Sequence, residues 1–474
     1  MRLKISKSKF TTSLYVIKSV YENGVNTTKV VEKIGTLEEI REKSNGVDPF
    51  VWAREYIDKL NSDSKKIKAN IMIPYSPVKT INYNDRLYSG GYLFLQKIYH
   101  ELKLDDICKD IEKKYSFDYD INSILSRLIY AKILHPASKL STYDVVQNLI
   151  EPPDFNLHDI YRSLDVIAKE SDYIQAALYK NRQRFCKHNS KILFYDYTNF
   201  FFEIEEERGL RQYGISKEHR SNPIVQLGLF IDGDGLPLAF CINPGNTNEQ
   251  TTLKPLEKMI IKDFGLAKFV VCTDAGLSST ANRVFNTLGE RAFITTQSIK
   301  QLKGFLKEWA LDKKGWRIIG NNNIFDLNTI SEELHKNTIF YKERWINENG
   351  LEQRLVVTFS IKTRNYQRII RENQVNRAVK LIESTAKTRH NQNDYKRFVT
   401  TTNLTTTGEL AENQELSINC QQIQKEEIFD GYYGVCTNLE DNVSEIININ
   451  KGRWEIEESF RIMKTELKSR PVYL

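Results

Sequence analysis

The sequence lacks paired cysteines, long apolar runs and a targeting segment. Its six cysteines are scattered through 474 residues, with no Cys-x2-Cys pair and no histidines at zinc-ligand spacing, which argues against disulfides and structural zinc. No segment approaches the roughly 20 apolar residues that a membrane helix needs, and the N-terminus has no apolar stretch of signal-peptide length. We therefore expect a reduced, cytoplasmic protein with no membrane partner.

The composition argues against a disordered chain. Hydrophobic residues make up 40%, aromatic residues 11% and charged residues 27% of the sequence, a balance typical of soluble globular proteins. The length allows about two to four domains. The formal net charge of +7 permits a polyanionic partner without requiring one.

The positive charge is concentrated in two segments. Residues 361–400 contain ten Lys and Arg against three Asp and Glu, and the first twenty residues contain five basic residues and no acid. Such a surplus is either a solvated surface or a surface that contacts phosphates, where counterion release favours binding. In the second case a basic amphipathic helix over Gln367–Ser384, with Arg364, Arg368 and Arg371 at its N-terminal end, positions DNA phosphates.

Two alternating segments near the N-terminus predict a β-hairpin. Ser13–Tyr21 and Val25–Ile34 both alternate apolar and polar residues, and the Asn23-Gly24 pair between them is the strongest short signal for a hairpin turn. A polar stretch from Asn61 to Lys66 and the Pro74–Pro77 region then predict a linker.

The rest of the chain changes from a helical pattern to an α/β pattern. Between residues 91 and 185 apolar residues recur at helical spacing, and this region could bind DNA, mediate dimerisation or serve as scaffold. From Lys191 onward, strands come first and helices and strands then alternate, which indicates a mixed sheet flanked by helices. The expected strands are 192–202, 224–231, 236–242, 268–273 and 292–296, followed after 300–430 by 434–437 and a final helix from about Lys451.

Three carboxylates stand out by their position. Asp196 lies within an apolar strand, Asp274 ends the strand Phe-Val-Val-Cys-Thr-Asp, and Glu457 lies on the C-terminal helix. Each also has an ordinary structural explanation: Asp196 can accept backbone hydrogen bonds, Asp274 can form a turn or cap, and Glu457 can pair with Arg453 or Arg461. Their occurrence together favours a shared site.

Three carboxylates suit phosphodiester chemistry. An attacking oxygen must be activated and a leaving oxygen stabilised, and two divalent ions about 3.5–4 Å apart do both. Mg²⁺ and Mn²⁺ prefer oxygen ligands, so Asp and Glu are the appropriate side chains. The ends of adjacent strands together with one helix hold three such side chains rigidly.

The segment Arg453-x3-Glu457-x6-Lys464 resembles the Tyr-x2-Arg-x3-Glu-x6-Lys signature of a large group of bacterial insertion-sequence transposases of the DDE class. Spacings of 4 and 7 place the three residues on one helix face. Phe-Tyr-Asp196-Tyr-Thr and Thr-Asp274-Ala-Gly resemble the first and second catalytic blocks of this group. The resemblance extends to Gly-Asn246-Thr-Asn-Glu, Phe-Asp-Gly-Tyr432-Tyr433 and Ser-Arg-Pro-Val-Tyr473.

The resemblance implies an α/β fold with an RNase H-like core, and DNA cleavage at element ends followed by joining of 3′ ends to target DNA. Asp196, Asp274 and Glu457 would hold two Mg²⁺ or Mn²⁺ ions, and Arg453 and Lys464 would position and neutralise phosphates of double-stranded DNA. A homodimer in the DNA complex and association with the nucleoid are implied as well. The predicted domains are a hairpin segment with linker (1–75), a helical domain (76–190), the catalytic core (191–299 and 431–474) and an insertion domain (300–430).

Two departures from the signature favour a different function, that of a truncated, inactive copy that acts only as a DNA-binding repressor. Asn450 stands where the signature has its tyrosine, and the chain ends ten residues after Lys464, where such transposases continue in further helices. The three acids also suit a metal-dependent nuclease that never rejoins strands. They suit a carboxylate-pair glycosidase less well, because no segment resembles an aromatic sugar-binding cleft.

Overall fold

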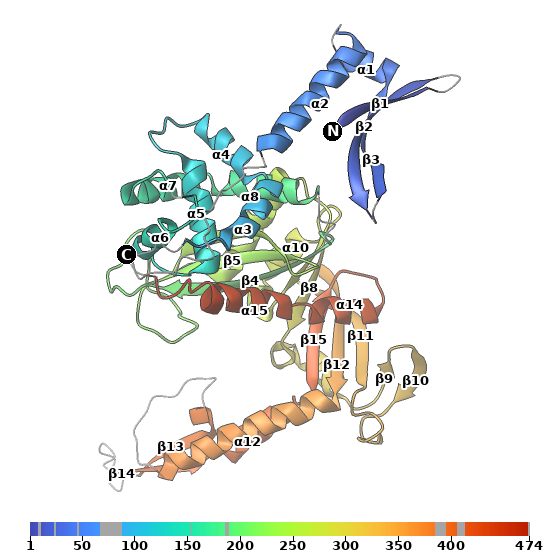
Figure 1. Ribbon diagram of the computed structural model, residues 1–474. Helices are drawn as coiled ribbons and strands as arrows, with labels where there is room; N and C mark the ends of the chain where they lie inside the picture. Colours follow the sequence, from blue (N-terminus) through green and yellow to red (C-terminus); the bar gives the residue numbers. More distant parts are fainter. Residues whose placement is uncertain are drawn as a thin grey trace. The chain divides into compact units, whose positions relative to one another are not determined.

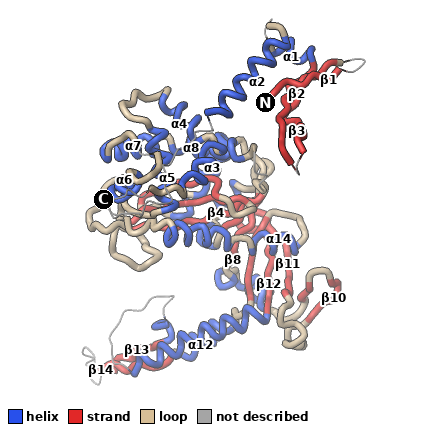
Figure 2. Tube along the Cα trace, viewed as in Figure 1, coloured by secondary structure: helices blue, strands red, loops and turns tan. Residues whose placement is uncertain are grey.

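The computed structural model describes residues 1–7, 11–22, 25–44, 47–66, 88–151, 153–184, 189–383, 395–404 and 413–472 (Figures 1 and 2). The chain divides into two compact units, Met1–Arg86 and Leu87–Leu474. No helix in these ranges is both long enough and apolar enough to cross a membrane.

The first unit is an antiparallel sheet with two helices. Its elements are β1 (Arg2–Lys7), β2 (Thr12–Glu22), β3 (Val25–Thr36), α1 (Leu37–Lys43) and α2 (Pro49–Lys66). The predicted hairpin is present as β2 and β3, which pair Glu22 with Val25, while the Asn23-Gly24 turn lies outside the described residues. Thr36 and Glu39 form a capping box that starts α1.

Two features of this unit differ from the sequence-based prediction. The strand β1, a short strand with three basic residues that pairs with β2, was not predicted. The assignment of 61–66 to a linker is wrong, since α2 continues to Lys66 because this stretch has no helix-breaking Pro or Gly. The Pro74–Pro77 region lies outside the described residues.

The second unit begins with the predicted helical region. Its helices are α3 (Tyr92–Glu101), α4 (Leu104–Glu112), α5 (Ile121–Leu134), α6 (Lys139–Val146), α7 (Leu157–Lys169) and α8 (Ser171–Arg182). Asp120 and Ser138 cap α5 and α6 by accepting hydrogen bonds from backbone N–H groups three residues on. The inward residues, among them Ile111, Ile124 and Tyr130, form a separate apolar core.

A mixed sheet flanked by helices follows, as predicted. Within the described residues it has ten strands in the order β10-β9-β11-β12-β15-β8-β7-β4-β5-β6. The strands are β4 (Ile192–Phe201), β5 (Ile224–Asp232), β6 (Pro237–Pro244), β7 (Val270–Thr273), β8 (Ala292–Gln297), β9 (Trp316–Ile318), β10 (Asn321–Phe325), β11 (Ile339–Glu348), β12 (Leu351–Ser360) and β15 (Tyr432–Thr437). The strand β4 pairs antiparallel with β5 and parallel with β7, and β7 pairs parallel with β8.

Short and long helices connect these strands or follow the last of them. They are η1 (Glu249–Thr251), α9 (Leu253–Met259), the π-helical η2 (Ile260–Phe264), η3 (Ala275–Leu277), α10 (Thr280–Phe285), η4 (Ile299–Gln301), α11 (Gly304–Leu311), α12 (Ile361–Glu383), α13 (Cys420–Glu427), α14 (Val443–Lys451), α15 (Trp454–Arg461) and the π-helical η6 (Ile462–Glu466).

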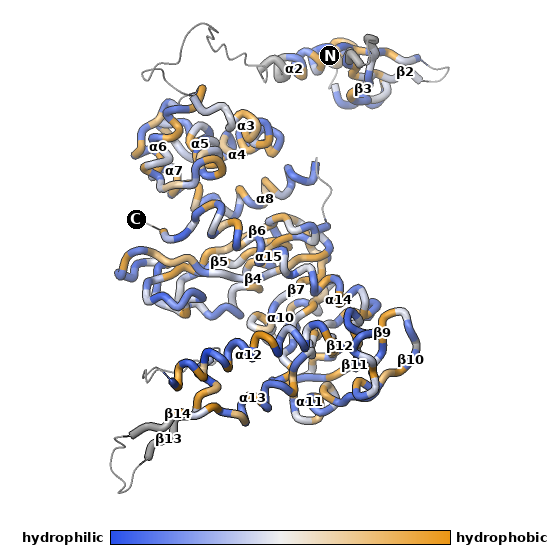
Figure 3. The backbone as a smooth tube through the Cα atoms, turned by 60° about the horizontal axis from the view of Figure 1, so that its bottom comes forward, coloured by the Kyte–Doolittle hydropathy of each residue, from blue (hydrophilic) through white to orange (hydrophobic). Residues whose placement is uncertain are grey.

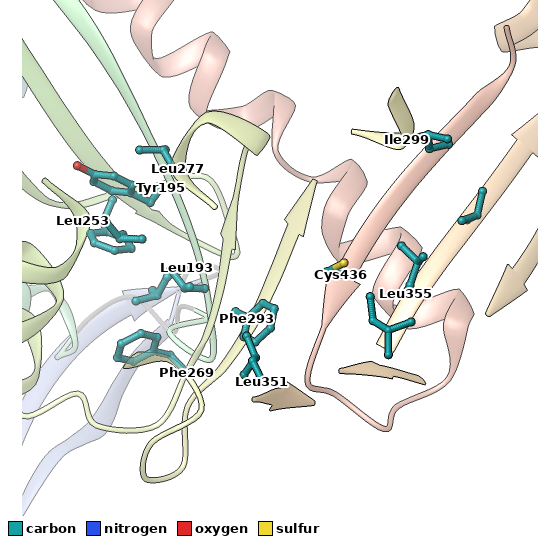
Figure 4. Close-up of a cluster of buried hydrophobic side chains, with 14 of the residues drawn as sticks. Leu193, Tyr195, Leu253, Phe269, Leu277, Phe293, Ile299, Leu351, Leu355 and Cys436 are labelled. Carbon is teal, nitrogen blue, oxygen red and sulfur yellow. The ribbon is translucent and has the colours of Figure 1, made fainter. Parts of the chain in front are cut away.

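Both faces of the sheet are buried around β4. Successive strand residues point to opposite faces, so Tyr195 belongs to one apolar core and Phe194 to the other. Figure 4 shows the first of these cores, where Tyr195 and Leu193 lie with Leu253 and Phe269. Burial on both faces explains why β4 is a nearly continuous apolar run, and it makes a carboxylate in that strand conspicuous.

The segment 300–430 contributes to the same sheet. The strands β9 to β12 extend it, and β15 joins β12 to β8. Beyond β12, the helix α12 packs with η5 (Tyr395–Phe398), β13 (Val399–Leu404) and β14 (Asn413–Ile418) around Ala378 and Phe398.

The predicted amphipathic character of α12 is wrong. Hydrophilic and hydrophobic residues alternate along this helix (Figure 3), and its apolar residues are not gathered on one face. Tyr366 is 64% exposed and Ile369 is 56% exposed, whereas Arg371 is buried. Tertiary contacts of individual side chains therefore decide which residues of α12 face solvent.

Candidate active site

The register of two parallel strands brings Asp196 and Asp274 together. The strands β4 and β7 pair Tyr195 with Thr273, and the next residue along the chain in each case is an aspartate, Asp196 within β4 and Asp274 just after β7. Neighbouring strands lie about 4.8 Å apart, so the two aspartates lie side by side where these two adjacent strands point toward the same end of the sheet. β7 ends at Thr273 while β4 continues to Phe201, so β7 does not cover this edge of β4 beyond the two acids; at its far end Phe202 forms a parallel bridge with Val472.

Asp196 is largely buried and faces several charges. Its Oδ1 accepts a hydrogen bond of 2.8 Å from the N–H of Tyr197, which is the ordinary structural role considered for this residue. Burial raises the pKa of the Asp196 carboxyl, and the neighbouring charge of Asp274 adds to this rise. Lys217, the Tyr197 N–H and Arg453 act on this pKa in the opposite direction. The side chain therefore lies in a cluster of charges rather than in an isolated structural contact.

Asp274 forms an ion pair and does not act as a cap. It precedes η3, but its side chain accepts no capping hydrogen bond there. Its Oδ1 lies 3.3 Å from Nη1 of Arg453, and half of the side chain is exposed. The same Nη1 donates to Oγ1 of Thr296 over 3.0 Å, so Arg453 links the ends of β7 and β8.

A phenol lies beside Asn450. Tyr433 on β15 accepts a hydrogen bond of 3.2 Å from Nδ2 of Asn450, and its hydroxyl lies 2.6 Å from Oγ1 of Thr296. A tyrosine of β15 thus occupies the neighbourhood of the position where the signature has its own tyrosine. Sequence spacing gave no indication of this contact, because Tyr433 comes from a different element.

The helix α15, which carries Glu457, packs along β4. A Cβ atom on Gly452 would lie 2.7 Å from the Phe194 ring, and Nζ of Lys464 lies 5.8 Å from the centre of the Phe200 ring, so α15 runs along β4. Glu457 lies between these two contacts along the chain.

The Glu457 side chain is exposed and makes no hydrogen bond or ion pair with any residue that the structure describes. The ion pairs considered as its structural role are absent there as well, because Arg461 pairs with Glu458 and Arg453 with Asp274. Among the described residues no group of three His, Cys, Asp or Glu could hold a metal ion as arranged.

Lys464 lies beyond the regular part of the helix. It belongs to η6, a π-helical turn that directly continues α15, and its Nζ lies over the Phe200 ring of β4. The shared helix face of Arg453, Glu457 and Lys464 stays a prediction. Its ammonium lies 3.6 Å from Oε1 of Glu218, and burial lowers its pKa.

The three arginines predicted to contact phosphates are largely neutralised. Arg371 is buried and donates two hydrogen bonds, of 2.7 and 2.5 Å, to Asp430. Arg364 pairs with Glu332 over 2.7 Å. Arg368 is half exposed and lies 3.8 Å from Asp430. A phosphate contact does not fit the geometry of Arg371, because it would require breaking a buried ion pair.

Lys217 also belongs to this site, although the sequence did not predict it. Its Nζ donates a hydrogen bond of 2.5 Å to the backbone oxygen of Tyr197 and lies 3.8 Å from the centre of the Tyr197 ring. The residue lies in the long connection between β4 and β5, and no spacing rule relates such a loop to a strand. The local signal is only the charged sequence Lys217-Glu-His-Arg220.

No family model matches the chain, and no curated protein matches it. Among solved structures, the piggyBac transposase synaptic complex with hairpin DNA is similar at 8% sequence identity over 80% of this chain and 69% of that chain, with a TM-score of 0.34. The Mos1 transposase paired-end complex with left transposon end is similar at 13% identity over 49% of this chain and 63% of that chain, with a TM-score of 0.15. TM-scores of this size assign neither a fold nor a family.

Proposed function

We propose that the protein is a DNA transposase of the DDE class with an RNase H-like core. It would cleave phosphodiester bonds at element ends and join the 3′ ends to double-stranded target DNA, acting as a homodimer in the DNA complex. The observation that carries this proposal is the β4–β7 register, which sets Asp196 beside Asp274 under a helix that carries Glu457 and Arg453. The mixed sheet, antiparallel in β4–β6 and parallel in β4, β7 and β8, agrees with an RNase H-like core.

The acids agree in part with a site for divalent ions. Asp196 and Asp274 provide the oxygen ligands that Mg²⁺ and Mn²⁺ prefer, on adjacent strands. Glu457 lies on α15, which packs along β4, and its exposed carboxylate would have to turn toward the two aspartates to complete the set. When bound, two such ions would activate the attacking oxygen and stabilise the leaving oxygen.

The cations have separate roles in this proposal. Arg453 is held between Asp274 and Thr296 and so presents a fixed charge beside both acids. In the DNA complex it would orient a phosphate oxygen, since a planar guanidinium makes directional pairs with phosphate. Lys464 would neutralise a phosphate after leaving Glu218.

A strand-transfer assay on a plasmid that carries the gene with its genomic flanks tests the function. Glu457→Gln should lower the Mg²⁺-dependent cleavage rate by about a hundredfold or more, because it removes a charged metal ligand. Glu458→Gln is the matched control, since Glu458 is the next residue of the same helix and pairs with Arg461. Hydrolysis without joining would favour the nuclease, and DNA binding without cleavage would favour the inactive repressor.

The basic helix gives a second test, in which DNA binding is measured as a function of salt concentration. Arg368→Gln should reduce the slope of log affinity against log salt by about 0.9, the value for one lost phosphate contact. Arg371→Gln should leave the slope unchanged and lower the thermal stability, because Asp430 would keep a buried charge without its partner. An equal loss of slope in both variants would contradict this assignment.

A further inference from the structure

The connection between β4 and β5 carries a segment that follows β4 beyond the end of β7, before the bridge between Phe202 and Val472. We call Ile215–Arg220 the edge loop. Asn199 donates a hydrogen bond of 3.2 Å from Nδ2 to the backbone oxygen of Ile215. Lys217 binds the backbone oxygen of Tyr197, and the guanidinium of Arg220 lies 4.2 Å from the centre of the Phe201 ring. Three strand positions therefore hold the loop against the edge where Asp196 lies.

The edge loop is also fixed internally. The Oγ of Ser216, which is buried, accepts hydrogen bonds from the N–H groups of Glu218 and Arg220, of 3.2 and 3.3 Å. His219 adopts a φ of 57°, in the left-handed region, where the chain turns back. These contacts hold the Lys217 backbone in one place, so the position of its ammonium does not depend on an unrestrained loop.

Lys217 carries a charge that no neighbouring carboxylate neutralises by an ion pair in the described part of the chain. The acid of its own loop, Glu218, pairs instead with Lys464 and with Arg470. One N–H of the ammonium is used by the Tyr197 backbone oxygen, and the ring of Tyr197 covers another side of it. The side chain is nevertheless exposed, so the remaining N–H can reach a ligand.

The ligand that fits this ammonium is a phosphate. Arg364, Arg371 and Lys464 are each engaged by an acid, whereas Lys217 stands at the edge of the two aspartates with one neutral acceptor. In the proposed site, divalent ions bound by the two aspartates would also bind a phosphate of the DNA. An ammonium held next to these aspartates would therefore lie near the same phosphate. An ammonium acts on phosphate as a point charge and needs no planar geometry.

We propose that Lys217 contacts a backbone phosphate of the DNA strand that lies against Asp196 and Asp274. This inference rests on the proposed function and adds to it a phosphate contact that the Arg-x3-Glu-x6-Lys helix does not supply. The edge loop would thereby fix where the DNA strand crosses the end of β4.

The test is the affinity for a duplex DNA fragment, measured against salt concentration in the presence of EDTA so that metal binding plays no part. Lys217→Gln should reduce the slope of log affinity against log salt by about 0.9, and Lys217→Arg should keep the slope of the parent protein. Lys254→Gln is the matched control. Lys254 of α9 also lies over an aromatic ring, 5.2 Å from the centre of the Phe285 ring of α10. This variant should not change the slope.

Lys217→Met, which keeps the apolar stem over Tyr197, replaces the Gln variant if that variant unfolds. If the parent protein binds and the slopes of both charge-removing variants equal its own, Lys217 only balances the charge of Asp196 and the inference is overturned while the proposed function stands. If the parent protein shows no salt-dependent DNA binding, the proposed function is overturned and the inference falls with it.

Discussion

Asp196→Asn is expected to abolish Mg²⁺-dependent strand cleavage, with a loss of at least about a thousandfold, which corresponds to about 4 kcal/mol of transition-state stabilisation. The substitution keeps the shape of the side chain and removes its negative charge. Asp196 stands next to Asp274 through the β4–β7 register, so it would be a ligand of the ions that the reaction requires.

The same substitution should leave stability without metal equal or slightly higher. Burial and the charge of Asp274 raise the pKa of the Asp196 carboxyl, so the folded state disfavours its ionised form. A neutral amide does not carry this penalty. The stabilisation that added Mg²⁺ gives should decrease, because a ligand stabilises only the state that binds it.

Thermal melts with and without Mg²⁺ check both expectations even where the parent protein does not cleave DNA. Asp234→Asn is the matched control: Asp234 also accepts a backbone hydrogen bond, of 2.7 Å from the N–H of Asn189, but in the turn between β5 and β6. A fall of about 1–3 kcal/mol in the stability of Asp196→Asn without metal, together with an unchanged Mg²⁺ shift, would make Asp196 a structural residue.

Glu257→Gln is expected to stabilise the protein by about 3 kcal/mol at pH 7 and by little at pH 4. Glu257 of α9 is fully buried, and its Oε1 accepts a hydrogen bond of 2.7 Å from Nδ2 of Asn286. Its Oε2 and the Oδ1 of Asn286 have no partner among the described residues. A neutral side chain at this position, protonated glutamate or glutamine, avoids burying a charge without a counterion.

The direction of the pH dependence follows from the difference between the pKa of Glu257 in the folded state and in the unfolded state. Burial raises the pKa of Glu257 from 4.5 to about 8, against the smaller opposing effects of Asn286, Arg291 and Lys254. Between these values the folded state holds a proton that the unfolded state has lost, so stability is greatest below pH 4.5 and falls as the pH rises toward 8. The glutamine variant lacks this titration and should keep its stability across the window.

Urea unfolding at several pH values between about 4 and 9 measures this difference. Glu290→Gln is the control, since Glu290 is exposed and pairs only with Lys268 at the surface. Equal pH dependence in the parent protein and in Glu257→Gln would mean that Glu257 is ionised in the folded state.

The sequence was sufficient for the hairpin β2–β3, for the strands β4 to β8 and β15, and for singling out two acids that the structure sets on adjacent strands. Asp196 could be identified because a carboxylate in a strand buried on both faces is costly without a partner, and Asp274 because it ends the next parallel strand. The Arg453–Glu457–Lys464 spacing predicted a common helix face; in the structure Arg453 precedes α15 as its N-cap, Glu457 lies within α15, and Lys464 lies in the π-helical turn that follows.

Local periodicity and composition alone determined that this chain forms a mixed sheet flanked by helices, with acids in its apolar strands. Only the tertiary structure decided which charges remain available, because ion pairs form between residues remote in sequence: Arg371 meets Asp430 across 59 residues, and Arg453 reaches Thr296 across 157. A basic segment therefore looked like a phosphate surface although its central arginine is neutralised and buried. Nothing in the sequence singled out Lys217, which the structure places on the edge of β4. The position of a loop depends on contacts along its whole length and not on a period in its residues.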